Sequence, residues 1–249
     1  MLNSELITDA KNRCSQTGFL RTGFSVKLSG AEGGHENGKL KTGTTTVGLV
    51  CKDGIVLATD NKATMGHLIA SKTAKKILEV SPKMAVTIAG DVGDAQAVVR
   101  LLSAELRLYT LSEKVLTVKA AATLLGNMLR DAYKSWMPEM IQLILGGADD
   151  RGVMLYSITA DGAVMIEDEY TFSGSGSVIA IGVLEDAYKK DMPVDEGIKL
   201  SVRAIKAARE RDVFTGGKDI NVVTITQKDG VKWVPQDKIN LIIKETDKK

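Results

Sequence analysis

The segment TTTVGLVCKDGIVLATD, residues 44–60, indicates how this chain begins to fold. Its two halves, TTTVGLVC and GIVLATD, are rich in β-branched and apolar residues, and Asp53-Gly54 lies between them. An Asp-Gly pair between two such runs is typical of a β-hairpin with a tight turn. The sequence therefore predicts a pair of antiparallel strands that starts at the three threonines.

Residues 1–43, which precede this hairpin, have a different composition. They are rich in Ser, Gly, Asn and Lys, show no sustained hydrophobic period, and end in LSGAEGGHENGKLKTG. A segment of this kind cannot bury much apolar surface. We therefore expect residues 1–43 to be a leader, and residues 44–249 to form one domain that ends in a short polar tail.

Downstream of the hairpin, strand-like and helix-like patterns follow one another in groups. Apolar residues recur at helical spacing in several segments, and Asp91 or Asp94 is a candidate N-cap for the first helix. Asp/Gly turns separate the strand-like segments, and Asp229-Gly230 forms the last of these turns. The predicted helices cover 91–109, 118–136, 178–190 and 194–212, and the predicted strands lie at 83–90, within 140–177 and within 219–235.

The order of these elements is strands, two helices, strands, two helices and strands, which predicts an α+β fold. Hairpins and helix pairs that are segregated along the chain favour antiparallel sheets over the parallel sheets of alternating chains. We expect a four-layer αββα sandwich, in which two antiparallel sheets pack face to face and helix pairs flank them.

Composition excludes several classes of partner. The chain has 249 residues, of which 44% are hydrophobic, and this is enough for a sizeable core. Its 33 basic and 31 acidic residues give a net charge of +2, which predicts no general attraction to nucleic acid or to a membrane surface. No apolar run approaches the roughly 20 residues that span a bilayer, and the first residues lack a secretory pattern, so we expect a cytoplasmic protein.

The two cysteines, Cys14 and Cys51, do not suggest a disulfide framework or a cysteine zinc site. Cys51 lies in an apolar segment, where a free cysteine behaves as a small hydrophobic residue. We expect neither a cofactor nor a metal ion.

The threonine run also has a chemical interpretation. A threonine hydroxyl needs a base to become a nucleophile, and the α-amino group of a chain-terminal threonine is one such base. The ordinary pKa of that amine, about 7.7 to 8.0, suits it to proton transfer near neutral pH. Thr44 gains such an amine only if the Gly43–Thr44 bond is cut, and a glycine before it lets the backbone bend so that the hydroxyl approaches the preceding carbonyl.

Five segments together resemble the catalytic β subunit of the archaeal-type 20S proteasome, in order and with matching spacing over residues 42–235. They are TGTTTVGLVCKDGIVLATD, KKIL, TIAGDVGDAQ, GSGSVIAIGVLE and AARERDVFTGG. The resemblance implies an N-terminal nucleophile hydrolase, which is a threonine peptidase made as a precursor and activated by autolysis. A threonine run by itself is weak evidence, since threonine is common in strands.

The resemblance implies specific roles for residues near the threonines. Thr44 matches the nucleophile, Asp60 the acidic partner and Lys76 the basic partner, whose ammonium stabilises an alkoxide-like state. Without the resemblance, Asp60 and Lys76 would be interpreted as a surface ion pair.

A second group matches the residues around the reacting atoms. Gly90 matches the glycine whose N–H faces the developing oxyanion. Ser175, Asp212 and Thr215 match the residues that hold the threonine amine and a water molecule, although the family usually has serine where Thr215 stands. The alternative interpretations are a turn glycine for Gly90, a glycine-rich turn for Ser175 and a solvated helix end for Asp212.

Substrate recognition is also implied by the resemblance. Small and apolar pocket walls predict cleavage after leucine, aromatic and other apolar residues. The backbone of Thr64 matches a position that pairs with an extended substrate. The residues that match the walls of the first specificity pocket are Ala63, Ala74, Ile88 and Val92.

The implied partners are other β subunits in heptameric rings, α subunits that cap these rings, an ATP-dependent unfoldase and unfolded protein substrates. The main alternative is a catalytically silent β subunit with a structural role, against which the joint presence of Gly43, Thr44, Asp60, Lys76 and Gly90 argues. A bacterial-type threonine peptidase that works with a different unfoldase is a related alternative, but such chains are shorter.

Overall fold

The computed structural model describes residues 43–112, 115–135 and 141–246. Of the predicted leader, residues 1–43, only Gly43 lies within the described residues. None of the helices in these ranges is both long enough and apolar enough to cross a membrane.

The first sheet is built on the predicted hairpin, which is confirmed. Strand β1, Thr45–Cys51, pairs antiparallel with β2, Gly54–Asp60, and the register closes with Cys51 opposite Gly54. Strand β10 extends this pair on one side and the β11–β12 hairpin extends it on the other, so that the order is β10-β1-β2-β11-β12. The added strands are β10 (Tyr170–Gly174), β11 (Ile220–Thr226) and β12 (Gly230–Trp233).

The second sheet has the order β5-β6-β7-β8-β9, and every neighbouring pair is antiparallel. A separate two-stranded ribbon, β3 (Ala63–Met65) and β4 (Leu68–Ser71), follows β2. The sequence did not predict this ribbon or β5, because both are short and lack a clear alternation of buried and exposed residues. The strands of the second sheet are β5 (Ile77–Ser81), β6 (Met84–Gly90), β7 (Ile141–Asp149), β8 (Gly152–Thr159) and β9 (Val164–Glu167).

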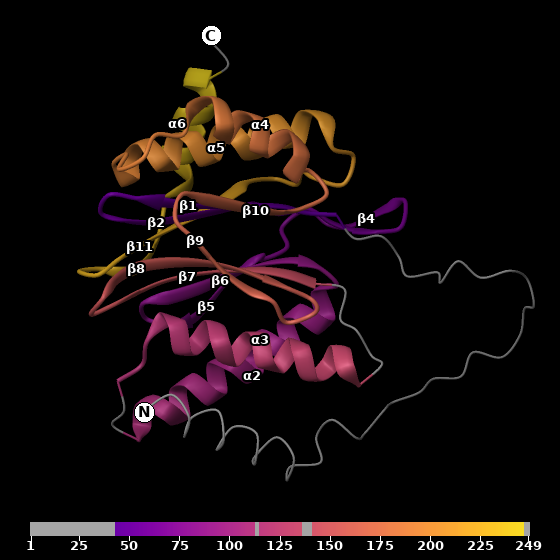
Figure 1. Ribbon diagram of the computed structural model, residues 1–249. Coiled ribbons are helices and arrows are strands. Elements are labelled where there is room, and N and C mark those ends of the chain that lie inside the picture. Colours follow the sequence, from indigo (N-terminus) through magenta and orange to yellow (C-terminus); the bar gives the residue numbers. More distant parts are fainter. Residues whose placement is uncertain (1–42, 113–114, 136–140, 247–249) are drawn as a thin grey trace, which may run out of the picture. The chain divides into compact units, whose positions relative to one another are not determined.

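Helices cover the outer faces of both sheets, which confirms the αββα sandwich. Figure 1 shows the four layers in order: α4 and α5, the β1 sheet, the β7 sheet, and then α2 and α3. Asp91, rather than Asp94, caps α2, since its carboxylate accepts from the N–H groups of Gly93 and Asp94 at 2.9 and 3.1 Å. The helix bounds are α2 (Val92–Leu111), α3 (Val118–Lys134), α4 (Ser177–Ala187) and α5 (Val194–Arg211).

A fifth described helix, α6 (Gln236–Thr246), lies where a short polar tail was expected. Ile239 and Ile242 are buried in the core cluster beneath α5, and Ile243 packs against it. The spacing of these three isoleucines is helical, so the signal was present within a segment whose other residues, apart from the exposed Leu241, are polar.

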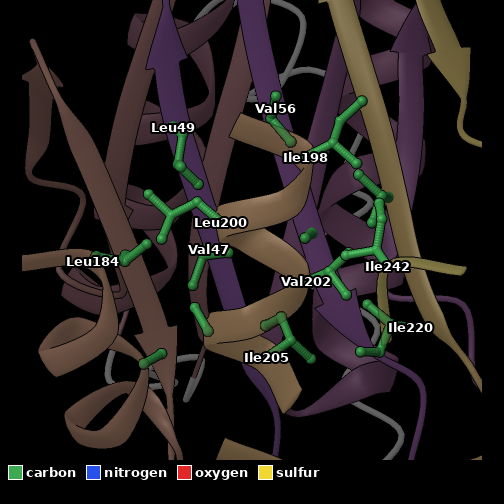
Figure 2. Packing of buried hydrophobic residues seen from close by; sticks show 14 of the residues in the cluster. Val47, Leu49, Val56, Leu184, Ile198, Leu200, Val202, Ile205, Ile220 and Ile242 are labelled. Carbon is green, nitrogen blue, oxygen red and sulfur yellow. The ribbon is translucent and has the colours of Figure 1, made fainter. Parts of the chain in front are cut away.

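Two clusters of buried apolar residues flank the β1 sheet. One lies between the β1 sheet and helices α4 to α6, where Leu49, Val202 and Ile205 are fully buried (Figure 2). The other lies between the two sheets and includes Leu57 and Ile144. Cys51 belongs to the first cluster, as expected, and burial raises the pKa of its thiol to about 12.

Candidate active site

Thr44 lies directly before β1, at the edge where β10 and β2 flank that strand. The pairing of Thr45 with Gly174 and of Thr46 with Thr59 fixes the backbone on both sides. Gly174 has a φ of 91°, and a Cβ placed on it would lie 2.0 Å from Thr44 O. Glycine at 174 is therefore required for β10 to approach Thr44 so closely.

Three groups meet at the Gly43–Thr44 bond. The Thr44 hydroxyl donates to Gly43 O at 2.8 Å, and Lys76 Nζ donates to the same oxygen at 3.3 Å. The Gly43 N–H donates to Thr64 Oγ1 at 3.2 Å. The hydroxyl and a cation thus lie on one carbonyl, the arrangement that an attack on that carbonyl needs.

Asp60, at the end of β2, is the central acceptor of the site. Its Oδ1 accepts from Lys76 Nζ at 2.8 Å and from the Thr45 N–H at 3.0 Å. Its Oδ2 accepts from the N–H groups of Gly216 at 2.9 Å and Lys62 at 3.2 Å. The carboxylate is fully buried, and four donors replace the water it has lost.

Lys76 is as deeply buried as Asp60, with 2% of its side chain exposed. Burial lowers the pKa of its ammonium, while the attraction of Asp60 opposes that shift. The interpretation of Asp60 and Lys76 as a surface ion pair is therefore wrong. Asp60 and Lys76 form a buried ion pair, and the ammonium of Lys76 points at the Gly43 carbonyl.

A second group of polar side chains contacts Thr44 and Thr45. Ser175 Oγ donates to Asp212 Oδ2 at 2.6 Å and lies 3.4 Å from Thr44 O. Thr215 Oγ1 donates to the same carboxylate oxygen and shares a hydrogen bond with Thr45 Oγ1 at 2.6 Å. Asp212 thus binds two hydroxyls, so the description of it as a merely solvated helix end is wrong.

The structure keeps the hydrogen bonds of Thr215 and buries its additional methyl group, since only 3% of the residue is exposed. The sequence assigned no side-chain contact to Thr45, whose hydroxyl joins this group. It also missed Gly216, which donates to Asp60. The only signal for Gly216 was the FTGG motif in the loop after α5, and the only signal for Thr45 was its place in the threonine run.

Gly90 ends β6, opposite Ile141 of β7, and has a φ of 107°. This left-handed backbone favours glycine. Its role toward an oxyanion remains a prediction.

The five residues expected to contact substrate lie in β3, in the segment before β5, in β6 and at the start of α2. Thr64, in β3, binds Gly43 through its hydroxyl. The Ile88 N–H donates to Lys76 O at 2.9 Å, and the Ala74 N–H donates at 2.8 Å to the carbonyl of Asn61, the residue after Asp60. Ala63 lies in β3, and Val92 is the first residue of α2. Their role as pocket walls remains a prediction.

Within the described residues, no group of three His, Cys, Asp or Glu side chains is arranged to hold a metal ion. The groups that the described residues bring to this centre are hydroxyls, carboxylates and the Lys76 ammonium. These groups can activate and stabilise an attack by a hydroxyl on a carbonyl carbon.

Two antiparallel sheets packed between helix layers, with a threonine at the head of an inner strand, define an α+β sandwich of the N-terminal nucleophile hydrolase type. The family model described as "Proteasome subunit" matches residues 40–225. The chain belongs to the proteasome subunit family, among its archaeal-type β subunits.

Several archaeal relatives support this assignment. "Proteasome subunit beta" of Ferroglobus placidus is 48% identical over 200 residues, which cover 80% of this chain and 94% of the relative. The protein of the same name from Archaeoglobus profundus is 48% identical over 206 residues, covering 82% and 94%. That of Methanocaldococcus fervens is 48% identical over 205 residues, covering 82% and 90%.

Proposed function

We propose that this chain is a threonine-type endopeptidase subunit of a 20S proteasome core particle, made as a precursor that removes its own leader. The observation that carries the proposal is the Gly43 carbonyl, which accepts from the Thr44 hydroxyl at 2.8 Å and from Lys76 Nζ at 3.3 Å. A nucleophile and a charge stabiliser therefore already contact the bond to be cut.

Self-cleavage begins with attack of Thr44 Oγ1 on the carbonyl carbon of Gly43. Negative charge develops on Gly43 O, where the Lys76 ammonium stabilises it, and Asp60 holds that ammonium in place. The C–N bond to Thr44 then breaks, the hydroxyl proton ends on the new amine, and Gly43 remains as an ester on Thr44 Oγ1. Water hydrolyses the ester, which frees the leader with a carboxylate at Gly43.

Peptide hydrolysis uses the freed amine of Thr44 as its base. The amine accepts the hydroxyl proton, Oγ1 attacks the substrate carbonyl, and the leaving amine takes the proton as the acyl-enzyme forms. Water then releases the acyl group. Ser175 and Asp212, which contact Thr44 O and one another, hold this end of the strand, and the N–H of Gly90 faces the oxyanion.

The same proposal assigns substrate choice and assembly. Ala63, Ala74, Ile88 and Val92 form an uncharged pocket that favours cleavage after apolar residues, and Thr64 pairs with the extended substrate. The chain assembles into heptameric β rings capped by α subunits, and a cytoplasmic ATP-dependent unfoldase supplies unfolded proteins. Residues 1–43 are the leader and 44–249 the catalytic domain. Because the site recognises side chains and cannot distinguish one protein from another, its enclosure in the barrel limits which proteins reach it.

The test is the intact mass of the chain after assembly with its α partner. We expect a mature chain that starts at Thr44 and hydrolyses a fluorogenic peptide with an apolar residue before the scissile bond. Thr44→Ala should abolish both leader release and hydrolysis. Thr46→Ser is the matched control, because the Thr46 hydroxyl bonds Ser173 at 2.7 Å and takes no part in the reaction.

A leader that stays attached in complete, unmutated particles would contradict the proposal and favour the silent structural subunit. Full peptide hydrolysis by the Thr44→Ala variant would contradict the choice of nucleophile.

A further inference from the structure

Gly43 and Phe214 are in unusually close contact. A Cβ placed on Gly43 would lie 1.7 Å from Phe214 Cβ, 2.7 Å from its Cγ and 2.9 Å from its Cα. Non-bonded carbon atoms are best separated by about 3.5 to 4.0 Å. Two of the three atoms, Cβ and Cα of Phe214, do not move when the ring rotates, so rotation of the ring cannot relieve the overlap.

Phe214 cannot easily retreat, because its loop is anchored on both sides. The Phe214 N–H donates to Asp212 Oδ1 at 3.2 Å, and Lys62 Nζ donates to Val213 O at 2.6 Å. Beyond Phe214, Thr215 is bonded to Thr45, and the Gly216 N–H donates to buried Asp60. A shift of the Phe214 backbone would strain hydrogen bonds to both groups of the active site.

Gly43 is held equally firmly from its own side. Its N–H binds Thr64 and its carbonyl accepts from Thr44 and Lys76. A side chain at 43 must therefore move either the loop or the scissile carbonyl. Movement of the carbonyl would take it away from both Thr44 Oγ1 and Lys76 Nζ.

We propose that Phe214 is a positioning residue for self-cleavage: it admits only glycine before Thr44 and so keeps the carbonyl of residue 43 within reach of the nucleophile. This inference rests on the proposed function. It adds Phe214 to the residues that act in self-cleavage, and it gives a second reason why residue 43 is glycine. Gly43 is required because Phe214 occupies the volume of a side chain, in addition to the backbone freedom that the sequence suggested. The bond that breaks remains Gly43–Thr44, and the reacting groups are unchanged.

The contact exists only while the leader is attached. Once Gly43 leaves, no atom of the leader remains for Phe214 to position. Phe214 therefore affects leader release, and this separates it from Asp60 and Lys76, which serve both reactions.

The experiment measures leader release by intact mass during assembly of the full-length chain with its α partner, in four variants. Gly43→Ala should slow release about 100-fold, since displacement of a reacting group by about 1 Å has a cost of this order. Gly43→Ala with Phe214→Ala should be equally slow, because the overlapping Cβ remains. Gly43→Ala with Phe214→Gly should be about tenfold faster than Gly43→Ala, since only the 2.9 Å approach to Cα is left. Phe214→Gly alone should release the leader.

A second readout separates positioning from general damage to the loop. Peptide hydrolysis per released leader should be the same in Phe214→Gly, in both double variants and in the unmutated chain. Equal slow release by both double variants would overturn the role of Phe214, as would fast release by Gly43→Ala alone. Neither result would touch the proposed function, which fails only through the Thr44→Ala variant or a retained leader in unmutated particles.

If Phe214→Gly prevents assembly, a crystal structure in the Thr44→Ala background decides the question. With Gly43→Ala added, we expect Phe214 or the residue-43 carbonyl to be displaced. An undisturbed Phe214, with the residue-43 carbonyl still close to Lys76 Nζ, would overturn the proposal.

Discussion

Thr44 and strand β1 together have a polar half, residues 44–46, and an apolar half, residues 47–51. Both halves are buried, but different interactions hold them in place. Thr44, Thr45 and Thr46 are at most 4% exposed, and Val47 and Leu49, a few residues on, are 0% exposed. The apolar half needs only neighbours of suitable volume, because the hydrophobic effect has no direction. The polar half needs a partner for each group, because an unbonded polar group is costly to bury.

The two halves differ in how many alternative neighbours could hold them in place. The partners of the apolar half come from a broad cluster in which no single contact is decisive. Those of the polar half are single atoms of Asp60, Ser173, Ser175 and Thr215. Substitutions in the apolar half should therefore change stability, and substitutions at the polar end that remove Thr44 or one of the charged groups facing it should change chemistry.

The largest effect that would sharpen this comparison is expected at Lys76. Lys76→Met should abolish leader release and peptide hydrolysis, because the charge facing Gly43 O is lost. It should also lower the free energy of unfolding by about 3 kcal/mol, since removal of one member of a buried pair leaves a buried charge. Urea unfolding and a fluorogenic peptide assay measure the two effects.

Asp60→Asn combined with Lys76→Met is the matched control. It removes both charges, so much of the lost stability should return while activity does not. Wild-type turnover in Lys76→Met would show that the Asp60–Lys76 pair has only a structural role. It would contradict the view that the polar half determines the chemistry.

The next effect concerns the apolar half. Leu49→Ala should lower the free energy of unfolding by about 2 to 5 kcal/mol, through lost burial and the cavity left beneath α5. Peptide hydrolysis per folded particle should be unchanged, because Leu49 contacts none of the reacting groups. Lys52→Ala, in the exposed turn after β1, is the control for stability. A selective loss of turnover in Leu49→Ala would show that the two halves are not independent.

The smallest effect is a pH dependence at the apolar end. Tyr188 donates to Val50 O at 2.9 Å and packs edge-on against Tyr170, and burial raises the pKa of each phenol from 10.0 to about 12. The folded state thus favours the protonated phenols, so their stabilisation is complete below pH 10 and is lost as the pH rises toward 12.

Thermal unfolding of the unmutated chain and of Tyr188→Phe between these two pH values checks this. Tyr188→Phe should be the less stable below pH 10, and the difference should shrink as the pH approaches 12. A difference that stayed constant across this interval would show that the phenol titrates alike in the folded and unfolded chains.

Much of the fold followed from local patterns. The Asp53-Gly54 turn, the helical spacing before and after each sheet and the order of the elements were sufficient for the αββα sandwich. The β3–β4 ribbon, β5 and α6 were missed because short elements carry too few residues for a period to stand out. In α6, three isoleucines in a polar segment were the only signal.

The candidate site was named through family resemblance, and the geometry adds what a resemblance cannot contain. Seven residues named from the sequence do belong to one connected set of hydrogen bonds that includes both sides of the Gly43–Thr44 bond: Gly43, Thr44, Asp60, Lys76, Ser175, Asp212 and Thr215. Phe214 was not among them, because nothing in a sequence shows that its Cβ occupies the space beside Gly43.

The sequence by itself determined the β1–β2 hairpin and the helices α2 to α5, and it placed a threonine after a glycine at the head of a strand, because these features depend on neighbouring residues. Only the tertiary structure decided that Asp60 and Lys76 are buried, that Asp60 has four donors and that Gly43 faces Phe214. The hydrogen-bonded hydroxyls of Thr45 and Thr215 are 170 positions apart in the chain. Contacts over such distances arise from the packing of whole layers, and no local pattern encodes them.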